Sequence, residues 1–197
     1  MPPYRSEPLR VLENPRSAPL VPNAVLGMLM FLFTEIMLFA GLISAHSIAR
    51  ASSVVGWPPP GQPRLPFEET ALNTAALLVS GVLVFFAQRS LRRDRKRTEA
   101  LLALGIALGA LFVGFQGVEW LGLIREGLTL TSSTHGAFFY LIVGVHALHA
   151  IAALAALVRV EMRLRRGVLA PSSLTATALF WYFVVGVWPV IYFQVYR

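Results

Sequence analysis

The chain has 197 residues, of which 56% are hydrophobic and 14% are charged, and it carries a formal net charge of +7. This composition, with a mean hydropathy of +0.64, is typical of an integral membrane protein and argues against a soluble domain. The absence of cysteine excludes disulfides, thiolate metal sites, iron–sulfur clusters and haem attached through a C-x-x-C-H motif.

Residues 1–23 form the first segment, which contains six prolines and three arginines. Proline fixes one backbone angle and removes a hydrogen-bond donor, so this density prevents a long regular helix. The segment also lacks a compact apolar stretch followed by small residues, which argues against a cleavable signal peptide. We therefore expect an extended cytoplasmic arm.

Five apolar segments follow, and each is long enough to cross about 30 Å of hydrocarbon as a helix. We find no internal repeat and no linker that would divide this part of the chain. The sequence therefore predicts an all-α integral membrane protein in which residues 24–197 form one five-helix bundle. The predicted spans are 24–45, 70–88, 100–124, 136–158 and 174–196.

Lys and Arg residues are distributed unequally between the two sides of the predicted bundle. The arm and the loops at 89–99 and 159–173 together hold 13 of the 17, and the opposite side holds 4. The positive-inside rule then places the N-terminus in the cytoplasm and the C-terminus in the periplasm. Arg89, Arg92 and Arg93 are candidate contacts to lipid headgroups. A nucleic-acid-binding patch is the weaker interpretation of the basic run.

The loop after the first span contains Gly-Trp-Pro-Pro-Pro-Gly at 56–61, with Pro63 and Pro66 following. So many prolines cannot continue a helix, and they predict a stiff, extended cap over one helix end. Tryptophan suits the aromatic belt at a membrane interface. The candidates for such interfacial or headgroup contacts are Trp57, Trp120, Trp181 and Trp188.

Four ionisable residues lie inside the apolar spans, where a charge is costly and usually marks a functional site or a packing anchor. Glu35, His146 and His149 fall near the middle of the first and fourth spans, so they lie at one depth in the bilayer. The two histidines, three residues apart, share a helix face, and Glu35 can meet one of them if these helices are neighbours. Glu119 lies nearer the outer interface, one turn after Gln116.

Several hypotheses fit the two histidines. A bis-histidine haem needs ligands from two helices, and His46 and His135 are expected outside the spans. A di-iron site needs Glu-x-x-His pairs on two helices, and the sequence contains none. A hydrogen-bonded pair that packs helices and a role in proton handling both stay open, with a metal or haem site as the weakest alternative. For Glu35, a structural anchor and a proton-linked role are equally open.

Small residues in the third span indicate close helix packing. Gly105 and Gly109 form a G-x-x-x-G pair, which Gly114 and Gly117 continue. Such faces let helix backbones approach within lipid, where hydrophobic burial no longer drives association.

Six motifs lie in order along nearly the whole chain: Phe33-Thr34-Glu35, Trp57-Pro58-Pro59, Leu72-Asn73-Thr74, Gln116 with Glu119-Trp120, Gly144-Val145-His146-Ala147-Leu148-His149, and Trp181-Tyr182-Phe183 with Trp188. Together they resemble subunit III of the haem–copper terminal oxidases in its short five-helix bacterial form. The sequence departs from the family pattern at Tyr182, where a histidine is usual, at Val185, where an aspartate is usual, and at Ala147, where a glycine is usual.

This resemblance implies a non-catalytic subunit of cytochrome c oxidase in the bacterial inner membrane, with no catalytic, cofactor-binding or metal-binding residue in this chain. It implies that subunits I and II hold the haems and copper. It also implies that the chain packs on subunit I, binds phospholipid, and supports proton uptake and stability during turnover. A subunit of a quinol oxidase or a nitric oxide reductase is the alternative within the family. A free-standing membrane cytochrome or a small transporter is the alternative from a different class.

Overall fold

The computed structural model describes residues 21–54, 56–61 and 67–196, and nearly all of the predicted N-terminal arm lies outside them. These residues contain five α-helices and no strand. All five helices are long and apolar enough to cross a membrane, which confirms the predicted fold class. They are α1 (Asn23–Ala51), α2 (Phe67–Ser90), α3 (Arg95–Arg125), α4 (Thr134–Arg165) and α5 (Pro171–Val195).

The helices extend beyond the apolar segments that predicted them. Helix α1 ends at Ala51 rather than at residue 45, and α4 ends at Arg165 rather than at residue 158. Polar residues continue these helices because water and headgroups solvate side chains at the membrane surface. Local signals fix several ends: the side chain of Asp94 caps α3, and that of Ser133 caps α4.

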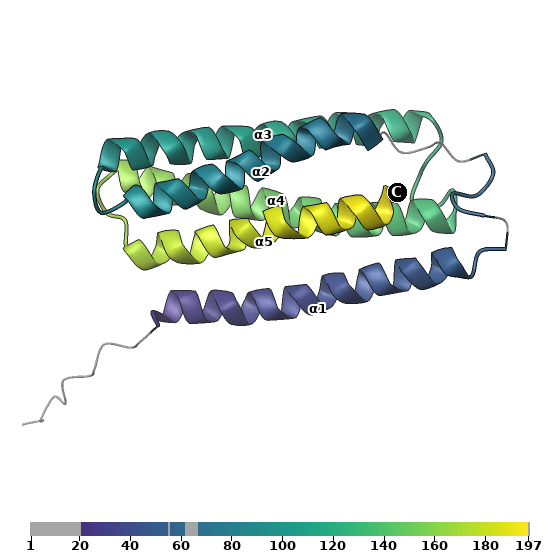
Figure 1. The fold of residues 1–197 in the computed structure, drawn as a ribbon, viewed down its shortest axis with the longest axis horizontal. Coiled ribbons are helices and arrows are strands. Elements are labelled where there is room, and N and C mark those ends of the chain that lie inside the picture. Colours follow the sequence, from purple (N-terminus) through teal and green to yellow (C-terminus); the bar gives the residue numbers. More distant parts are fainter. Residues whose placement is uncertain (1–20, 55, 62–66, 197) are drawn as a thin grey trace, which may run out of the picture.

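Helices α2 to α5 form a four-helix bundle, and α1 lies along its outside (Figure 1). Each bundle helix contacts two neighbours in the order α2, α3, α4, α5 and back to α2, whereas α1 contacts α4 and α5. The first and fourth helices are therefore neighbours, which is the condition for Glu35 to meet a histidine of α4.

Helix α1 attaches through a narrow stripe of residues. Its buried residues, Leu32, Phe39 and His46, are spaced seven apart, and Met28 and Leu42 pack beside them. This is the spacing of a heptad seam, in which positions a and d face the neighbouring helices. Glu35 occupies the d position between Met28 and Leu42, where an apolar residue is usual.

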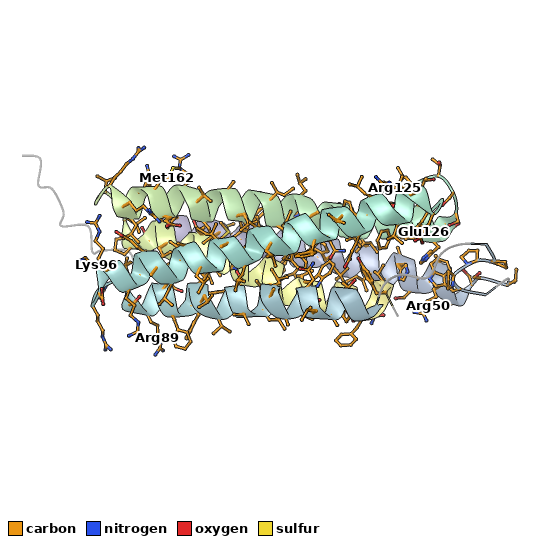
Figure 2. The ribbon with its side chains drawn as sticks, turned by 90° about the horizontal axis from the view of Figure 1, so that it is seen from above. Arg50, Arg89, Lys96, Arg125, Glu126 and Met162 are labelled. Atoms are coloured by element: carbon orange, nitrogen blue, oxygen red, sulfur yellow. The ribbon has the colours of Figure 1, made fainter. Side chains whose placement is uncertain are left out.

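Charged residues lie at the two ends of the long axis, with apolar side chains between them. Figure 2 places Arg89 and Lys96 at one end, and Arg50, Arg125 and Glu126 at the other. Large apolar side chains are exposed along the middle, as expected for a surface that faces lipid or other membrane helices. They include Met30, Phe33, Leu72, Phe115 and Leu148.

The predicted G-x-x-x-G pair brings α3 close to its neighbours. A Cβ atom on Gly109 would lie 2.7 Å from the Trp181 ring, and one on Gly105 would lie 3.1 Å from Val84. Within this chain the contact does not continue to Gly114 and Gly117, because a Cβ on either would meet no atom within 4 Å. Five residues turn a helix by about 140° beyond one full turn, so Gly114 points away from the face of Gly109.

Candidate functional site

A hydrogen bond joins α1 to α4 near the middle of both helices. Oε2 of Glu35 lies 2.9 Å from Nε2 of His149, and the two side chains are 15% and 13% exposed. This is the contact that the matched depths of these residues predict. The stripe along α1 therefore contains one polar member, which is paired with a partner on the bundle.

The second nitrogen of His149 fixes how protons are arranged in this pair. Nδ1 lies 2.7 Å from the carbonyl oxygen of Val145, and a carbonyl only accepts, so Nδ1 carries a hydrogen. A neutral imidazole then has no hydrogen on Nε2, and this nitrogen accepts a hydrogen bond from the protonated carboxyl group of Glu35. A charged imidazole instead donates from Nε2 to the carboxylate. In both forms one proton lies between the two groups, and their total charge is zero.

Aromatic rings enclose this pair. The ring of His149 has ring centroids of Phe31, Phe39, Phe180 and Phe183 within 5.6 to 6.5 Å. These rings exclude water and lower the local dielectric, which strengthens the hydrogen bond between the two titratable groups.

His146 shares a helix face with His149 but lies in different surroundings. It is 2% exposed, and its ring centroid lies 5.1 Å from that of Trp188 on α5. Its Nε2 has no hydrogen-bond partner among the described residues. Both rings lie near Phe39 of α1, but only His149 forms a hydrogen bond to that helix, whereas His146 packs on Trp188 inside the four-helix bundle.

Glu119 belongs to a second polar cluster, which joins α2, α3 and the end of α5. The amide nitrogen of Gln116 donates to Oε2 of Glu119 at 2.7 Å and to the hydroxyl of Tyr196 at 2.9 Å. The hydroxyl of Thr70 donates to the same carboxylate oxygen at 3.1 Å. Sequence reasoning paired Gln116 with Glu119 but missed Thr70 and Tyr196, because contacts between helices depend on how each helix is rotated.

Sequence reasoning also missed a histidine cluster near the end of the bundle that holds Arg50 and Arg125. The expectation that His46 and His135 lie outside the helices is wrong, because α1 and α4 extend past their apolar segments. They are 1% and 3% exposed, and the ring centroid of Trp57 lies 5.4 and 5.1 Å from theirs. The described part of the proline-rich loop is non-helical and covers these helix ends, while Pro63 and Pro66 lie outside the described residues.

Two of the predicted interfacial tryptophans lie inside the bundle. Trp181 and Trp188 are 0% exposed. Their indole nitrogens donate to Ser80 at 3.1 Å and to Thr74 at 2.8 Å, both on α2. They are therefore not headgroup contacts, because α2 satisfies the indole N–H that a membrane interface would otherwise solvate. Trp120 is half-buried beside Tyr140.

The positions where α5 departs from the family pattern both contact α2. The hydroxyl of Tyr182 donates to the side chain of Gln88 at 3.1 Å. Val185 packs against Gly81, where an added Cβ would lie 3.1 Å from its methyl group. A polar contact is thus retained on α5 without a histidine or an aspartate.

The arginine-rich end of the bundle has a hollow of about 450 Å³ between α2 and the start of α5. Arg89, Arg92 and Arg93 line it and are exposed. Their charges surround space large enough for a phosphate-bearing headgroup.

Within the described ranges, no three His, Cys, Asp or Glu side chains gather as a metal-ligand set. The pair formed by Glu35 and His149 and the cluster around Glu119 are hydrogen-bonded assemblies. Their hydrogen bonds hold helices together.

Comparisons with known proteins agree with the motif order. Residues 18–197 match the family model described as cytochrome c oxidase subunit III. A probable cytochrome c oxidase subunit 3 of Nocardia farcinica is 32% identical over 182 residues, which covers 89% of this chain and 88% of the relative. Cytochrome c oxidase subunit 3 of Pelomedusa subrufa is 34% identical, covering 88% and 69% of the two chains. That of Danio rerio is 35% identical, covering 86% and 67%.

Proposed function

Because this chain belongs to the cytochrome c oxidase subunit III family, we propose that it is the non-catalytic third subunit of a respiratory oxidase that reduces oxygen to water. The match over residues 18–197 carries this proposal. The haems and copper then belong to subunits I and II, and this chain acts by packing, by binding lipid and by supporting proton uptake.

Large uncovered apolar faces support packing on subunit I and binding of phospholipid. Helix α1 buries only three of its 29 residues. A groove of about 870 Å³ also runs along α2 and α3, with Leu72, Leu111 and Phe115 among its lining residues. Such faces suit acyl chains and neighbouring membrane helices, while Arg89, Arg92 and Arg93 suit headgroup phosphates.

The single proton held between Glu35 and His149 supports a role in proton handling. A carboxyl group paired with an imidazole can accept or release a proton while the pair changes charge by only one unit. The same pair anchors α1, so the proposed function gives Glu35 both a structural and a proton-linked role. The same anchor supports stability during turnover, because detachment of α1 would remove support from subunit I.

The charge distribution supports a location in the bacterial inner membrane with the N-terminus in the cytoplasm. Ten Lys and Arg residues lie in the two segments 89–97 and 159–166, at or near the end that holds Arg89 and Lys96. This is the side that the positive-inside rule assigns to the cytoplasm.

A subunit of a quinol oxidase or a nitric oxide reductase is the second candidate. Tyr182 and Val185 favour it, since these positions depart from the usual family pattern. A free-standing membrane cytochrome or transporter is the candidate from a different class.

Purification in mild detergent tests these alternatives. We expect the chain to co-migrate with two larger subunits that carry haem and copper, and the complex to consume oxygen when given reduced cytochrome c. Turnover with quinol alone would favour the second candidate. A Soret band in the isolated chain, or purification without any oxidase subunit, would contradict the proposal.

A further inference from the structure

The interior of the bundle contains a cavity that the proposed function does not use. It has a volume of about 140 Å³ and lies between α3 and α4, with Trp188 of α5 as part of its wall. Gly117 and Ile151 at its rim are exposed, so it opens toward the side of the bundle rather than toward either end.

Three polar side chains line this cavity with buried atoms that lack partners among the described residues, and one of these atoms is the indole nitrogen Nε1 of Trp120. Gln116 is 5% exposed and His146 is 2% exposed. Oε1 of Gln116 and Nε2 of His146 have no hydrogen-bond partner within the described part of the chain. Because buried polar groups are almost always hydrogen-bonded, this arrangement calls for a polar occupant.

The neighbouring contacts fix the orientation of the Gln116 amide. Its nitrogen donates to the carboxylate of Glu119 and to Tyr196, so the oxygen faces the other way. Trp188 cannot satisfy either atom, since its indole N–H already donates to Thr74. The cavity therefore offers one acceptor on Gln116, one donor on the indole of Trp120, and one imidazole nitrogen of His146 that can donate or accept.

We propose that this cavity is an internal water site, in which water molecules bridge Oε1 of Gln116 to Nε2 of His146. Its volume accommodates about four waters at roughly 30 Å³ each, and water supplies donors and acceptors together. An acyl chain would leave both polar atoms without partners. The waters extend the polar cluster around Glu119 inward to His146, which lies one turn from the pair formed by His149 and Glu35.

Solid-state NMR of the intact oxidase complex in bilayers, with ¹⁵N-histidine in this chain, tests the proposal. We expect magnetisation to pass from water protons to the imidazole of His146, whose signal is assigned by its loss in His146→Gln. A resolved His146 signal without such transfer would overturn the water site. So would a correlation between His146 and a side chain of a neighbouring subunit, because that side chain would then fill the cavity.

Substitutions that fill the cavity test whether the water lies there. Ala147→Leu places a larger side chain in the cavity, whereas Ala152→Leu makes the same change at an exposed position of α4 outside it. We expect the transfer to be lost in the first variant and kept in the second. If Ala147→Leu does not assemble, Gly117→Val serves instead, since a Cβ at Gly117 meets no atom within 4 Å. Transfer that persists in an assembled cavity-filling variant would contradict the assigned site.

Discussion

His149 forms a hydrogen bond with Glu35 that joins the four-helix bundle to α1, with 2.9 Å between Nε2 and Oε2. The two residues are separated by 114 positions in the sequence. Since Glu35 occupies a d position in the stripe of α1, the bond fixes both the register and the rotation of that helix. Polar residues in such seams commonly specify register.

Two substitutions of Glu35 distinguish its structural role from its proton-linked role. Glu35→Ala leaves Nε2 of His149 buried without a partner, at a cost of about 1–3 kcal/mol, so we expect a less stable complex with unchanged haem spectra. Glu35→Gln keeps a donor to a neutral His149 but removes the exchangeable acid, so we expect normal assembly with slower proton uptake. Detergent melting and turnover assays measure the two effects. Loss of haem in Glu35→Ala would contradict the accessory role.

The close approach at Gly109 predicts a strong effect of a single methyl group. Gly109→Ala places its Cβ 2.7 Å from the Trp181 ring and 2.9 Å from Leu154, so we expect destabilisation of about 1–3 kcal/mol from overpacking. Gly114→Ala meets nothing within 4 Å and should be neutral or slightly stabilising, since alanine is the better helix former. Thermal melts of both variants in one detergent give the comparison, and equal melting temperatures would refute it.

Ser80 links three helices through one hydroxyl. It donates to the backbone of Gly105 at 2.7 Å and accepts from the indole of Trp181 at 3.1 Å. We expect Ser80→Ala to destabilise the bundle by about 1–3 kcal/mol, because a buried indole N–H loses its partner. Ser47→Ala, at an exposed position whose hydroxyl bonds within its own helix, is the matched control. In a double-mutant cycle, Trp181→Phe should reduce the cost of Ser80→Ala; additive effects would exclude the coupling.

The orientation of the chain is testable because the sequence contains no cysteine. Thr131→Cys and Val168→Cys introduce single thiols at exposed positions in loops at opposite ends of the bundle. A membrane-impermeant maleimide added to spheroplasts should label the first directly and the second only after the membrane is permeabilised. The reverse pattern would place the N-terminus outside.

The sequence predicted the five helices well because each contains a mainly apolar run about as long as a bilayer core is thick. Residue depth followed from counting along those runs, which is why Glu35 and His149 were expected at one level. Counting gives depth but not rotation, so it did not show that His149 rather than His146 forms the hydrogen bond to Glu35. For the same reason it assigned Trp181 to an interface, whereas hydroxyl groups on α2 hold it inside.

The histidine cluster was missed for a different reason. His46 and His135 lie where the apolar runs have ended but the helices continue, so a prediction from hydropathy stops short of them. Their burial depends on Trp57, which comes from a loop whose path the sequence does not specify.

The attachment of α1 to α4 and α5 alone has a consequence for biosynthesis. A ribosome adds about 5–20 residues per second, so Glu35 is synthesised roughly 6–23 s before His149. During that interval α4 and α5 are not yet complete, so the first helix has neither a surface to pack on nor a hydrogen-bonding partner for Glu35. The carboxyl group of Glu35 is therefore inserted unpaired, either into lipid or against a chaperone. Packing of α1 on α4 and α5 is then one of the last steps of folding. Faults in maturation should accumulate chains in which α2 to α5 are assembled and the first helix is still free.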